Sequence, residues 1–249
     1  MTNLLVDVGN TRLKWALERD GVLGESASSA HRYLVLAEVL QPIAALGSRP
    51  ARVVVSNVGG TSLGEGLTKL VQTRFRVPAE FAVVRREAFG LRIAYAHPER
   101  LGVDRWLGMI AARAGHAGAL LVVGAGTAMT IDAVDVSGAH LGGLIVPGLA
   151  TMKASLLAGT AGIRDAGDTD GVPELFAADT GAAVNGGVTH ALAALVERAA
   201  DELARRAGGE PQLVLTGGDA ARVRSLISRP GIVDPDLVLR GLVVYARGR

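Results

Sequence analysis

The chain has 249 residues, of which 49% are hydrophobic and 20% are charged, and it contains no Cys. This length suffices for one large domain or two small ones, and the apolar fraction excludes a disordered chain. The absence of Cys excludes a disulfide scaffold, a thiolate nucleophile and any Cys-based metal site.

The charge pattern does not predict a nucleic-acid partner. The formal net charge is only +2, and the basic residues, nearly all of them Arg, are scattered along the chain. A nucleic-acid interface needs a stripe of positive charge with aromatic side chains for stacking, and aromatic residues make up only 4% of the sequence.

The start of the chain predicts no secretory signal. MTNLLVDVGN has no basic segment before its apolar run and reaches Asp7 almost at once. The uncharged stretches 114–131 and 136–152 are interrupted by Gly or Pro, so buried strands joined by tight turns explain them better than membrane spans. We therefore expect a cytoplasmic protein with no membrane partner.

In the first half, the spacing of apolar residues alternates between strand and helix patterns. A polar segment that contains Pro, residues 94–100, precedes the last helix of this half. The expected elements are strands at 4–8, 12–18, 52–57 and 80–84, and helices at 34–46, 63–75 and 104–114.

The second half continues the same alternation and ends in two short helices. Its expected elements are strands at 120–123, 129–134, 142–146 and 213–216, and helices at 149–158 and 180–206.

The second half also resembles the first half in sequence. LLVDVGNT at 4–11 aligns with LVVGAGTA at 121–128, and VVVSN at 53–57 aligns with LVLTG at 213–217. Two similar halves, residues 1–115 and 116–249, predict a duplicated α/β fold with a cleft between them. The alternative is that buried strands ending in Gly look alike in any α/β protein.

The first hairpin turn has the composition of a phosphate-binding loop. Asp7 ends a buried strand, where α/β sheets place their ligands, and Gly9 permits a tight turn with exposed backbone N–H groups. Asn10 and Thr11 add uncharged donors, and Lys14 adds a positive charge on the next strand. Asp7 is a candidate Mg²⁺ ligand, because magnesium prefers one or two carboxylates plus phosphate oxygens. The alternative is a plain hairpin in which Asp7 caps its own turn.

Two Gly-rich turns in the second half extend this hypothesis. The chain contains neither G-x-x-x-x-G-K-[ST] nor G-x-G-x-x-G after a strand, so any ATP site must be built from hairpin turns. The turn at 124–130 would form a second phosphate-binding jaw, unless it is simply a Gly-rich hairpin with satisfied Thr hydroxyls. The turn at 216–219 lacks Cβ atoms where a flat base or a ribose would approach.

Candidate catalytic residues follow Tyr95 at the start of a predicted helix. Gly102, Val103, Asp104 and Arg105 occupy consecutive positions there. Asp104 suits removal of a proton from a substrate hydroxyl, and Arg105 suits a substrate carboxylate in fork geometry. The alternative is an ordinary helix cap at Asp104.

Thr180 opens the long helix of the second half. It suits either a helix cap or an anion bound at the helix N-terminus. The five His residues show no metal-ligand spacing.

Taken together and in order, the motifs DVGNT, GVDR, GAGTAMTID, HLGGLIVPG, DTGAAVNG and LTGGD resemble those of the type III pantothenate kinases. This family belongs to the actin and sugar kinase superfamily, and the resemblance covers essentially the whole chain. It implies two ribonuclease-H-like halves, a homodimer, and ATP-dependent phosphorylation of pantothenate with Mg²⁺, the first step of coenzyme A synthesis.

The resemblance also implies roles for individual residues, with Asp104 as the base that acts on the pantothenate hydroxyl. The implied contacts with ATP are Asp7, Val8, Gly9, Asn10, Thr11, Arg12, Leu13, Lys14 and Thr127, and the implied contacts with pantothenate are Tyr95, Gly102, Val103, Asp104, Arg105 and Thr180.

One position departs from the family pattern. The family commonly has D-x-G-T at the second-half turn, where the Asp binds a monovalent cation such as K⁺ or NH₄⁺, but this chain has Gly124 there. Asp132 is too far along the next strand to replace it, so no monovalent-cation site is assigned. Two rival functions stay open: a kinase for another small hydroxy acid, and a non-catalytic regulator that binds ATP with the same fold.

Overall fold

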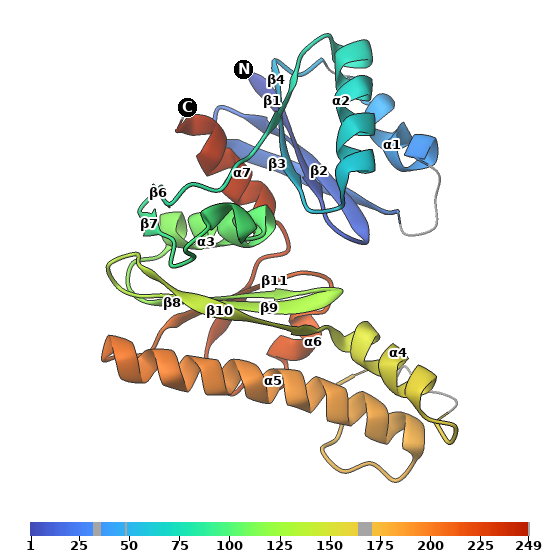
Figure 1. Cartoon of the computed structure of the whole chain (residues 1–249), viewed down its shortest axis with the longest axis vertical. Coiled ribbons are helices and arrows are strands. Elements are labelled where there is room, and N and C mark those ends of the chain that lie inside the picture. Colours follow the sequence, from blue (N-terminus) through green and yellow to red (C-terminus); the bar gives the residue numbers. More distant parts are fainter. Residues whose placement is uncertain (32–35, 48, 164–170, 249) are drawn as a thin grey trace. The chain divides into compact units, whose positions relative to one another are not determined.

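The computed structural model describes residues 1–31, 36–47, 49–163 and 171–248, and the chain forms two compact units. The first unit comprises Met1–Gly115 and Asp236–Arg249, and the second comprises His116–Pro235. Each unit contains one five-stranded sheet with helices packed against it (Figure 1). No helix among the described residues is long and apolar enough to cross a membrane.

The sheet of the first unit has the strand order β3-β2-β1-β4-β5. The pairs β3–β2 and β2–β1 are antiparallel, whereas β4 runs parallel to β1, and β5 runs parallel to β4. The strands are β1 (Thr2–Val8), β2 (Arg12–Arg19), β3 (Val22–Ala30), β4 (Arg52–Asn57) and β5 (Ala79–Phe81).

The sheet of the second unit repeats this topology strand for strand. Its order is β10-β9-β8-β11-β12, with the same antiparallel and parallel neighbours. The strands are β8 (Leu120–Ala125), β9 (Ala128–Val134), β10 (His140–Pro147), β11 (Gln212–Thr216) and β12 (Gly231–Val233). The expected duplication is therefore confirmed, because the aligned segments 4–11 and 121–128 occupy equivalent central hairpins.

Helices cover both faces of the first sheet. One face packs against α1 and α2 through a cluster that includes Leu4, Val6, Ile43, Leu67 and Phe75. Because strand side chains alternate between faces, the contacts of α7 with β1 and β4 lie on the opposite face, where α7 also packs against α3. These helices are α1 (Leu36–Ala44), α2 (Thr61–Phe75), α3 (Val103–Gly115) and α7 (Leu237–Arg247).

The C-terminal helix α7 differs from the expectation that residues 116–249 form one half. Leu239, Leu242 and Tyr245 of α7 are buried, and the ring of Tyr245 packs edge-on against Trp106 of α3 with centroids 5.9 Å apart. The apolar face of α7 is covered in this way, so the last residues of the chain belong to the first unit.

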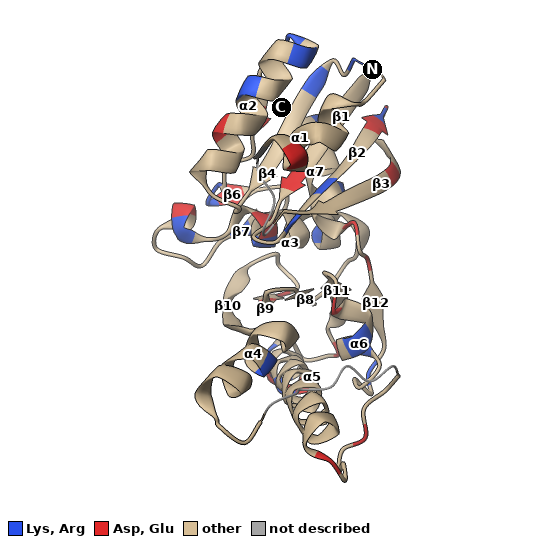
Figure 2. Cartoon of the chain, turned by 90° about the vertical axis from the view of Figure 1, so that its right-hand side faces the viewer, with Lys and Arg blue, Asp and Glu red and all other residues tan. Residues whose placement is uncertain are grey.

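In the second unit, α5 packs along one face of the sheet. The cluster there joins Leu121 and Val123 of β8 to Leu192 and Val196 of α5, with Val223 of α6. Along α4, the only charged residue is Lys153, whereas α2 carries both acidic and basic residues (Figure 2). These helices are α4 (Leu149–Gly159), α5 (Thr180–Ala207) and α6 (Ala220–Arg224).

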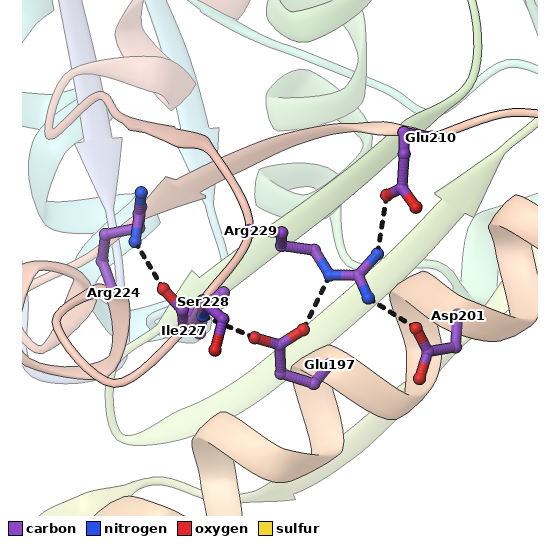
Figure 3. A network of polar contacts seen from close by, with 7 residues as sticks. All are labelled: Glu197, Asp201, Glu210, Arg224, Ile227, Ser228 and Arg229. Carbon is purple, nitrogen blue, oxygen red and sulfur yellow. Dashed lines mark hydrogen bonds and ion pairs between the residues drawn. The ribbon is translucent and has the colours of Figure 1, made fainter.

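An ion-pair network ties α5 to the loop that precedes β12. Figure 3 shows Arg229 with its Nε 2.7 Å from Glu197 and its Nη1 2.8 Å from Glu210, while Nη2 contacts Asp201. Glu197 also accepts a hydrogen bond from the backbone N–H of Ser228 at 2.6 Å. Burial alone would raise the pKa of Glu197, but the hydrogen bonds from Arg229 and from this amide outweigh it and lower the pKa.

The structure contains elements that the apolar spacing did not predict. They are β3, β12, the two-stranded hairpin of β6 (Glu87–Ala88) and β7 (Leu91–Arg92), and the 3-10 helix η1 (Pro98–Arg100). The predicted helices and the other strands are present, with ends that shift by up to a few residues. The first two residues of the helix expected at 34–46 lie outside the described residues.

Candidate active site

Asp7 and Lys14 lie side by side on one face of the first sheet. They are directly opposite each other in the antiparallel β1–β2 pair, and residues opposite each other in such a pair point to the same face. The side chains of Val8 and Leu13 belong instead to the core under α1 and α2. Val8 and Leu13 belong to the predicted phosphate loop, but only their backbone groups are available to bind a phosphate.

Asp7 is half-buried, and its Oδ1, which is shielded from solvent, has no hydrogen-bond partner among the described residues. Burial raises the pKa of Asp7 to about 7, with a further increase from the nearby carboxylate of Asp104, while the Ser56 hydroxyl and Lys14 lower it. An orphaned carboxylate oxygen at a strand end is costly unless a ligand satisfies it. This feature fits a magnesium ion that is held by one carboxylate and by phosphate oxygens.

The turn between β1 and β2 is held from two sides. The backbone N–H of Gly9 donates to the carbonyl of Arg12 at 3.0 Å, and the carbonyl of Gly9 accepts from Nε2 of His31 at 2.8 Å. A Cβ on Gly59 would stand only 2.6 Å from that carbonyl. These contacts fix the backbone of the turn and leave Asn10 exposed at its tip.

Asp104 lies in the first turn of α3, as expected. Its Oδ1 accepts from the backbone N–H of Arg105 at 2.8 Å, which orients the carboxylate at the helix start. A Cβ on Gly102 would stand 2.6 Å from this same Oδ1. Gly102 therefore gives the Asp104 carboxylate the space it occupies.

Arg105 and Tyr95 are in contact in the first unit. Nη1 of Arg105 donates to the Tyr95 hydroxyl at 3.2 Å, and Arg105 is only 8% exposed. Arg86 donates to the carbonyls of Tyr95 and Ala96 at 3.3 and 2.7 Å. The polar segment before α3 is held in this way, so its tyrosine can orient the guanidinium.

Lys14 also forms an ion pair with a residue at the far end of the chain. Its Nζ is 3.1 Å from Oδ1 of Asp236, and the two side chains are 26% and 20% exposed. Asp236 immediately precedes α7.

In the second unit, three turns come together at the end of β8. The carbonyl of Ala125 accepts from the backbone N–H of Asp219 at 3.1 Å, and a Cβ on Gly217 would stand 2.2 Å from the same carbonyl. A Cβ on Gly148 would stand 1.8 Å from the carbonyl of Gly126. The predicted turns at 124–130 and 216–219 are thus neighbours, and Thr127 is exposed at the tip of the first.

Position 124 does not fit a carboxylate-based cation site. Gly124 lies between Thr130 and Thr216 in the sheet, and a Cβ there would stand 2.8 Å from the Thr130 hydroxyl. Asp132 does not take over this role, because its Oδ1 is paired with Nε2 of His140 at 3.1 Å. Neither position therefore offers a carboxylate to a monovalent cation.

Thr180 is the first residue of α5, and Asp179 caps that helix in its place. Oδ1 of Asp179 accepts from the backbone N–H of Ala182 at 2.9 Å. Thr180 lies instead in a groove of about 460 Å³ between α4 and α5, together with Met152 and Leu156.

The predicted site residues thus fall into two groups. Asp7, Lys14, Tyr95, Asp104 and Arg105 belong to the first unit, and Thr127 and Thr180 belong to the second. Within the described ranges, no group of three His, Asp or Glu side chains could hold a metal by itself.

Sequence reasoning missed three neighbours of the site, namely Ser56, His31 and Asp236. Ser56 pairs with Asp7 in the parallel β1–β4 register, and its position at the end of a predicted strand was an available signal. His31 and Asp236 carried no sequence signal, because only the tertiary fold brings them to the hairpin.

Comparison of the sequence with protein-family models identifies the family of this chain. A family model described as type III pantothenate kinase matches residues 3–202. The chain belongs to the type III pantothenate kinase family. The expectation drawn from the sequence motifs is confirmed at this level.

Curated relatives match the chain along nearly its whole length. A type III pantothenate kinase from Nitrosococcus oceani is 40% identical, with 98% of this chain and 93% of the relative covered. One from Azoarcus sp. is also 40% identical, covering 98% and 90%, and one from Paracidovorax citrulli is 37% identical, covering 100% and 99%.

Solved structures support the fold. A protein from Campylobacter jejuni described as a Baf family transcriptional activator has a TM-score of 0.63 at 22% identity, with 98% of both chains covered. A polyphosphate/ATP-glucomannokinase from Arthrobacter has a TM-score of 0.50 at 16% identity, covering 100% and 99%. Both structures thus share the overall fold of this chain, in which two five-stranded α/β units repeat the same topology.

Proposed function

We propose that the chain transfers the γ-phosphoryl group of ATP to a hydroxyl of pantothenate, the first step of coenzyme A synthesis. The observation that carries this proposal is the arrangement in the first unit. A carboxylate with a shielded, orphaned oxygen, Asp7, lies beside Lys14 and close enough to Asp104 to be perturbed by it. Phosphoryl transfer needs groups that bind the phosphates, the metal ion and the acceptor alcohol within one small region.

Asp104 acts as the general base in this proposal. Its carboxylate takes the proton of the pantothenate hydroxyl while the oxygen attacks the γ-phosphorus, and the bond to the leaving oxygen of ADP breaks. The contact of its Oδ1 with the backbone N–H of Arg105 holds the carboxylate in one orientation. Positioning of this kind matters because phosphoryl transfer depends mainly on alignment and charge neutralisation.

Arg105 binds the carboxylate of pantothenate. A guanidinium offers five N–H donors in a fixed fork that matches a carboxylate. The Tyr95 hydroxyl accepts one of these donors at 3.2 Å, which sets the plane of the fork. The near-complete burial of Arg105 strengthens its interaction with a bound anion.

The phosphates of ATP contact the turn from Gly9 to Thr11, together with Lys14. Asp7 would hold Mg²⁺, which neutralises charge on the phosphate oxygens. In the second unit, Thr127 and the glycine turn at 216–219 are proposed to contact the nucleotide, because backbone without Cβ atoms allows close approach. Since the reaction consumes ATP, we place the enzyme in the cytoplasm.

We also propose a homodimer that forms through α4 and the edge strand β10. The sequence of α4 is apolar nearly all round, yet only Leu149 of it is buried, and such a helix is normally covered. Two further apolar side chains of the second unit are exposed, namely Ile145 of β10 at 62% and Phe176 of the loop before α5 at 87%. A patch of this kind marks an interaction surface.

The deciding experiment is a coupled assay for ADP release that depends on pantothenate, run with and without K⁺. We expect turnover with pantothenate, none with other small hydroxy acids, and no requirement for K⁺. Nucleotide binding without turnover would favour the regulator, and turnover on another acid would favour the rival kinase.

Asp104→Asn tests the assigned base. We expect kcat to fall by roughly 10²–10⁴ with ATP binding intact, the usual size of a general-base effect. Glu99→Gln is the matched control, because Glu99 lies in η1 shortly before α3 and its side chain is 69% exposed. Near-normal turnover in Asp104→Asn would refute the role.

A further inference from the structure

The ammonium of Lys14 lies on the same face as Asp7, at the end of the phosphate turn. A lysine side chain has four rotatable carbons and a single strongly hydrated charge, so it samples many positions unless a partner restrains it. Phosphoryl transfer gains most from charge that is already in place when the transition state forms. The group that restrains Lys14 therefore affects the rate.

One group that restrains Lys14 is Asp236, which is 222 residues further along the chain. Its Oδ1 is 3.1 Å from Nζ of Lys14. Asp236 occupies the N-cap position of α7 but forms no side-chain capping hydrogen bond there, although Asp is among the best capping residues. Its carboxylate points to the lysine of the phosphate turn instead of to its own helix.

The ion pair of Lys14 and Asp236 is partly buried. The two side chains are only 26% and 20% exposed, so solvent screens their attraction less than that of an exposed pair. Asp236 is held in turn by α7, whose backbone N–H at Arg240 donates to the Asp236 carbonyl at 2.9 Å. The carboxylate is thus fixed to a helix that is packed into the first unit.

We propose that Asp236 is a positioning residue for phosphoryl transfer, which holds the Lys14 ammonium beside Asp7 where the triphosphate binds. This inference rests on the proposed kinase function. In this role Asp236 acts through Lys14 and not by contact with the substrate. Its loss removes one restraint on the Lys14 ammonium, so kcat falls while the KM for pantothenate, which other residues bind, stays unchanged.

A double-mutant cycle tests this role in the full-length protein. The variants are Asp236→Asn, Lys14→Met and both together, and the measured quantities are kcat, both KM values and the Kd of ADP. We expect Asp236→Asn to lower kcat about 5–30-fold with the KM for pantothenate within twofold. Lys14→Met should lower kcat further, and the double variant should equal Lys14→Met alone, because Asp236 then has nothing to position.

Two further variants separate positioning from folding. Asp236→Ser keeps a capping oxygen without the charge and should behave like Asp236→Asn, whereas Asp236→Glu should recover part of the lost rate. Asp234→Asn changes the net charge equally, two residues away, and should leave kcat within twofold of the wild type.

The inference is overturned if Asp236→Asn keeps kcat within twofold, if it raises kcat, or if the penalties of Asp236→Asn and Lys14→Met add. Failure of the proposed function itself would look different, because the wild-type protein would then bind no ADP or release none in the presence of pantothenate.

Discussion

At the scale of single residues, Asp7 links stability to the chemistry of the site. One oxygen of its carboxylate is shielded from solvent, and its pKa is raised to about 7 from an ordinary value of 3.8. Because the native protein then binds this proton more tightly than the unfolded chain, stability falls as the pH rises from about 4 to 7. The full penalty persists at higher pH, when the carboxylate is ionised without a ligand.

Asp7→Asn removes this penalty. We expect the variant to melt roughly 2–4 °C above the wild type at pH 8 for each kcal/mol regained, with no difference near pH 4. ATP with Mg²⁺ should raise the Tm of the wild type, because a ligand that binds only the folded state stabilises it, and should raise that of the variant less, because the variant lacks the Mg²⁺ ligand. The measurement is thermal unfolding followed by circular dichroism, and a variant that melts below the wild type at pH 8 would contradict the assignment.

Gly102 provides a second test at this scale. A Cβ there would stand 2.6 Å from Oδ1 of Asp104, so Gly102→Ala forces the carboxylate to turn. We expect kcat to fall about 10-fold or more, since small misplacements of a reacting group cost large factors in rate. The Tm should change by less than 2 °C, roughly what 1 kcal/mol produces, because a flexible side chain rather than backbone has to move. Unchanged kcat would show that the orientation of Asp104 in this structure is not the reactive one.

The residues that could be predicted are those on local motifs. Asp7, Lys14 and Asp104 follow from strand ends, a hairpin and a helix start, which neighbouring sequence specifies. His31 and Asp236 approach the hairpin only in the folded chain, and no spacing in the sequence relates them to it.

At the scale of elements, a strand could be predicted from the sequence only where its residues are buried. The strand β3 was not predicted because all nine of its residues, VLGESASSA, are exposed or half-buried. This exposure is expected for a strand at the edge of a sheet. The strand β12 has only three residues, too few to show a period. The central strands were predictable because the core demands continuous apolar runs.

The ion-pair network of Arg229 is expected to stabilise the second unit. Arg229 is 16% exposed and contacts three carboxylates, so Arg229→Gln should cost about 1–3 kcal/mol in the free energy of unfolding, the range expected when a partly buried network is broken. The control is Arg205→Gln, whose exposed pair with Glu202 should contribute less than about 0.5 kcal/mol. Denaturant unfolding of both variants at pH 7 gives the comparison, and equal effects would contradict it.

The pH dependence of this effect has a definite sign. Because the folded protein lowers the pKa of Glu197 below its ordinary value of 4.5, the stabilisation is present above pH 4.5 and is lost as the pH falls through the lowered pKa. The difference between Arg229→Gln and the wild type should therefore shrink in acid.

The packing of α7 on α3 gives another prediction at this scale. A Cβ on Gly241 would stand 2.2 Å from the backbone carbonyl of Leu107, so Gly241→Ala must push the two helices apart. We expect a loss of about 1–3 kcal/mol, typical of overpacking a core. Arg240→Ala, at the exposed neighbouring position, should stay within about 0.5 kcal/mol of the wild type. Denaturant unfolding measures both, and a neutral Gly241→Ala would show that the helices can separate freely.

At the scale of the whole molecule, the apolar surface of α4 and β10 makes oligomeric state a test of the proposal. Ile145→Asp places a charge on β10 and should convert the dimer to a monomer in light scattering after size exclusion. Val22→Asp is the control, because Val22 is 72% exposed but lies on β3 of the first unit. A wild-type protein that is monomeric at micromolar concentration would refute the dimer.

The sequence by itself determined the family, the duplicated fold and the local motifs. Each of these can be recognised from short segments of neighbouring residues, whether or not the segments meet in space. Only the tertiary structure decided that the last helix returns to the first unit, that one oxygen of Asp7 is shielded without a partner, and that Asp236 meets Lys14. These features arise from packing between distant segments, in which the need to cover an apolar face on α7 brings a remote carboxylate to the phosphate turn.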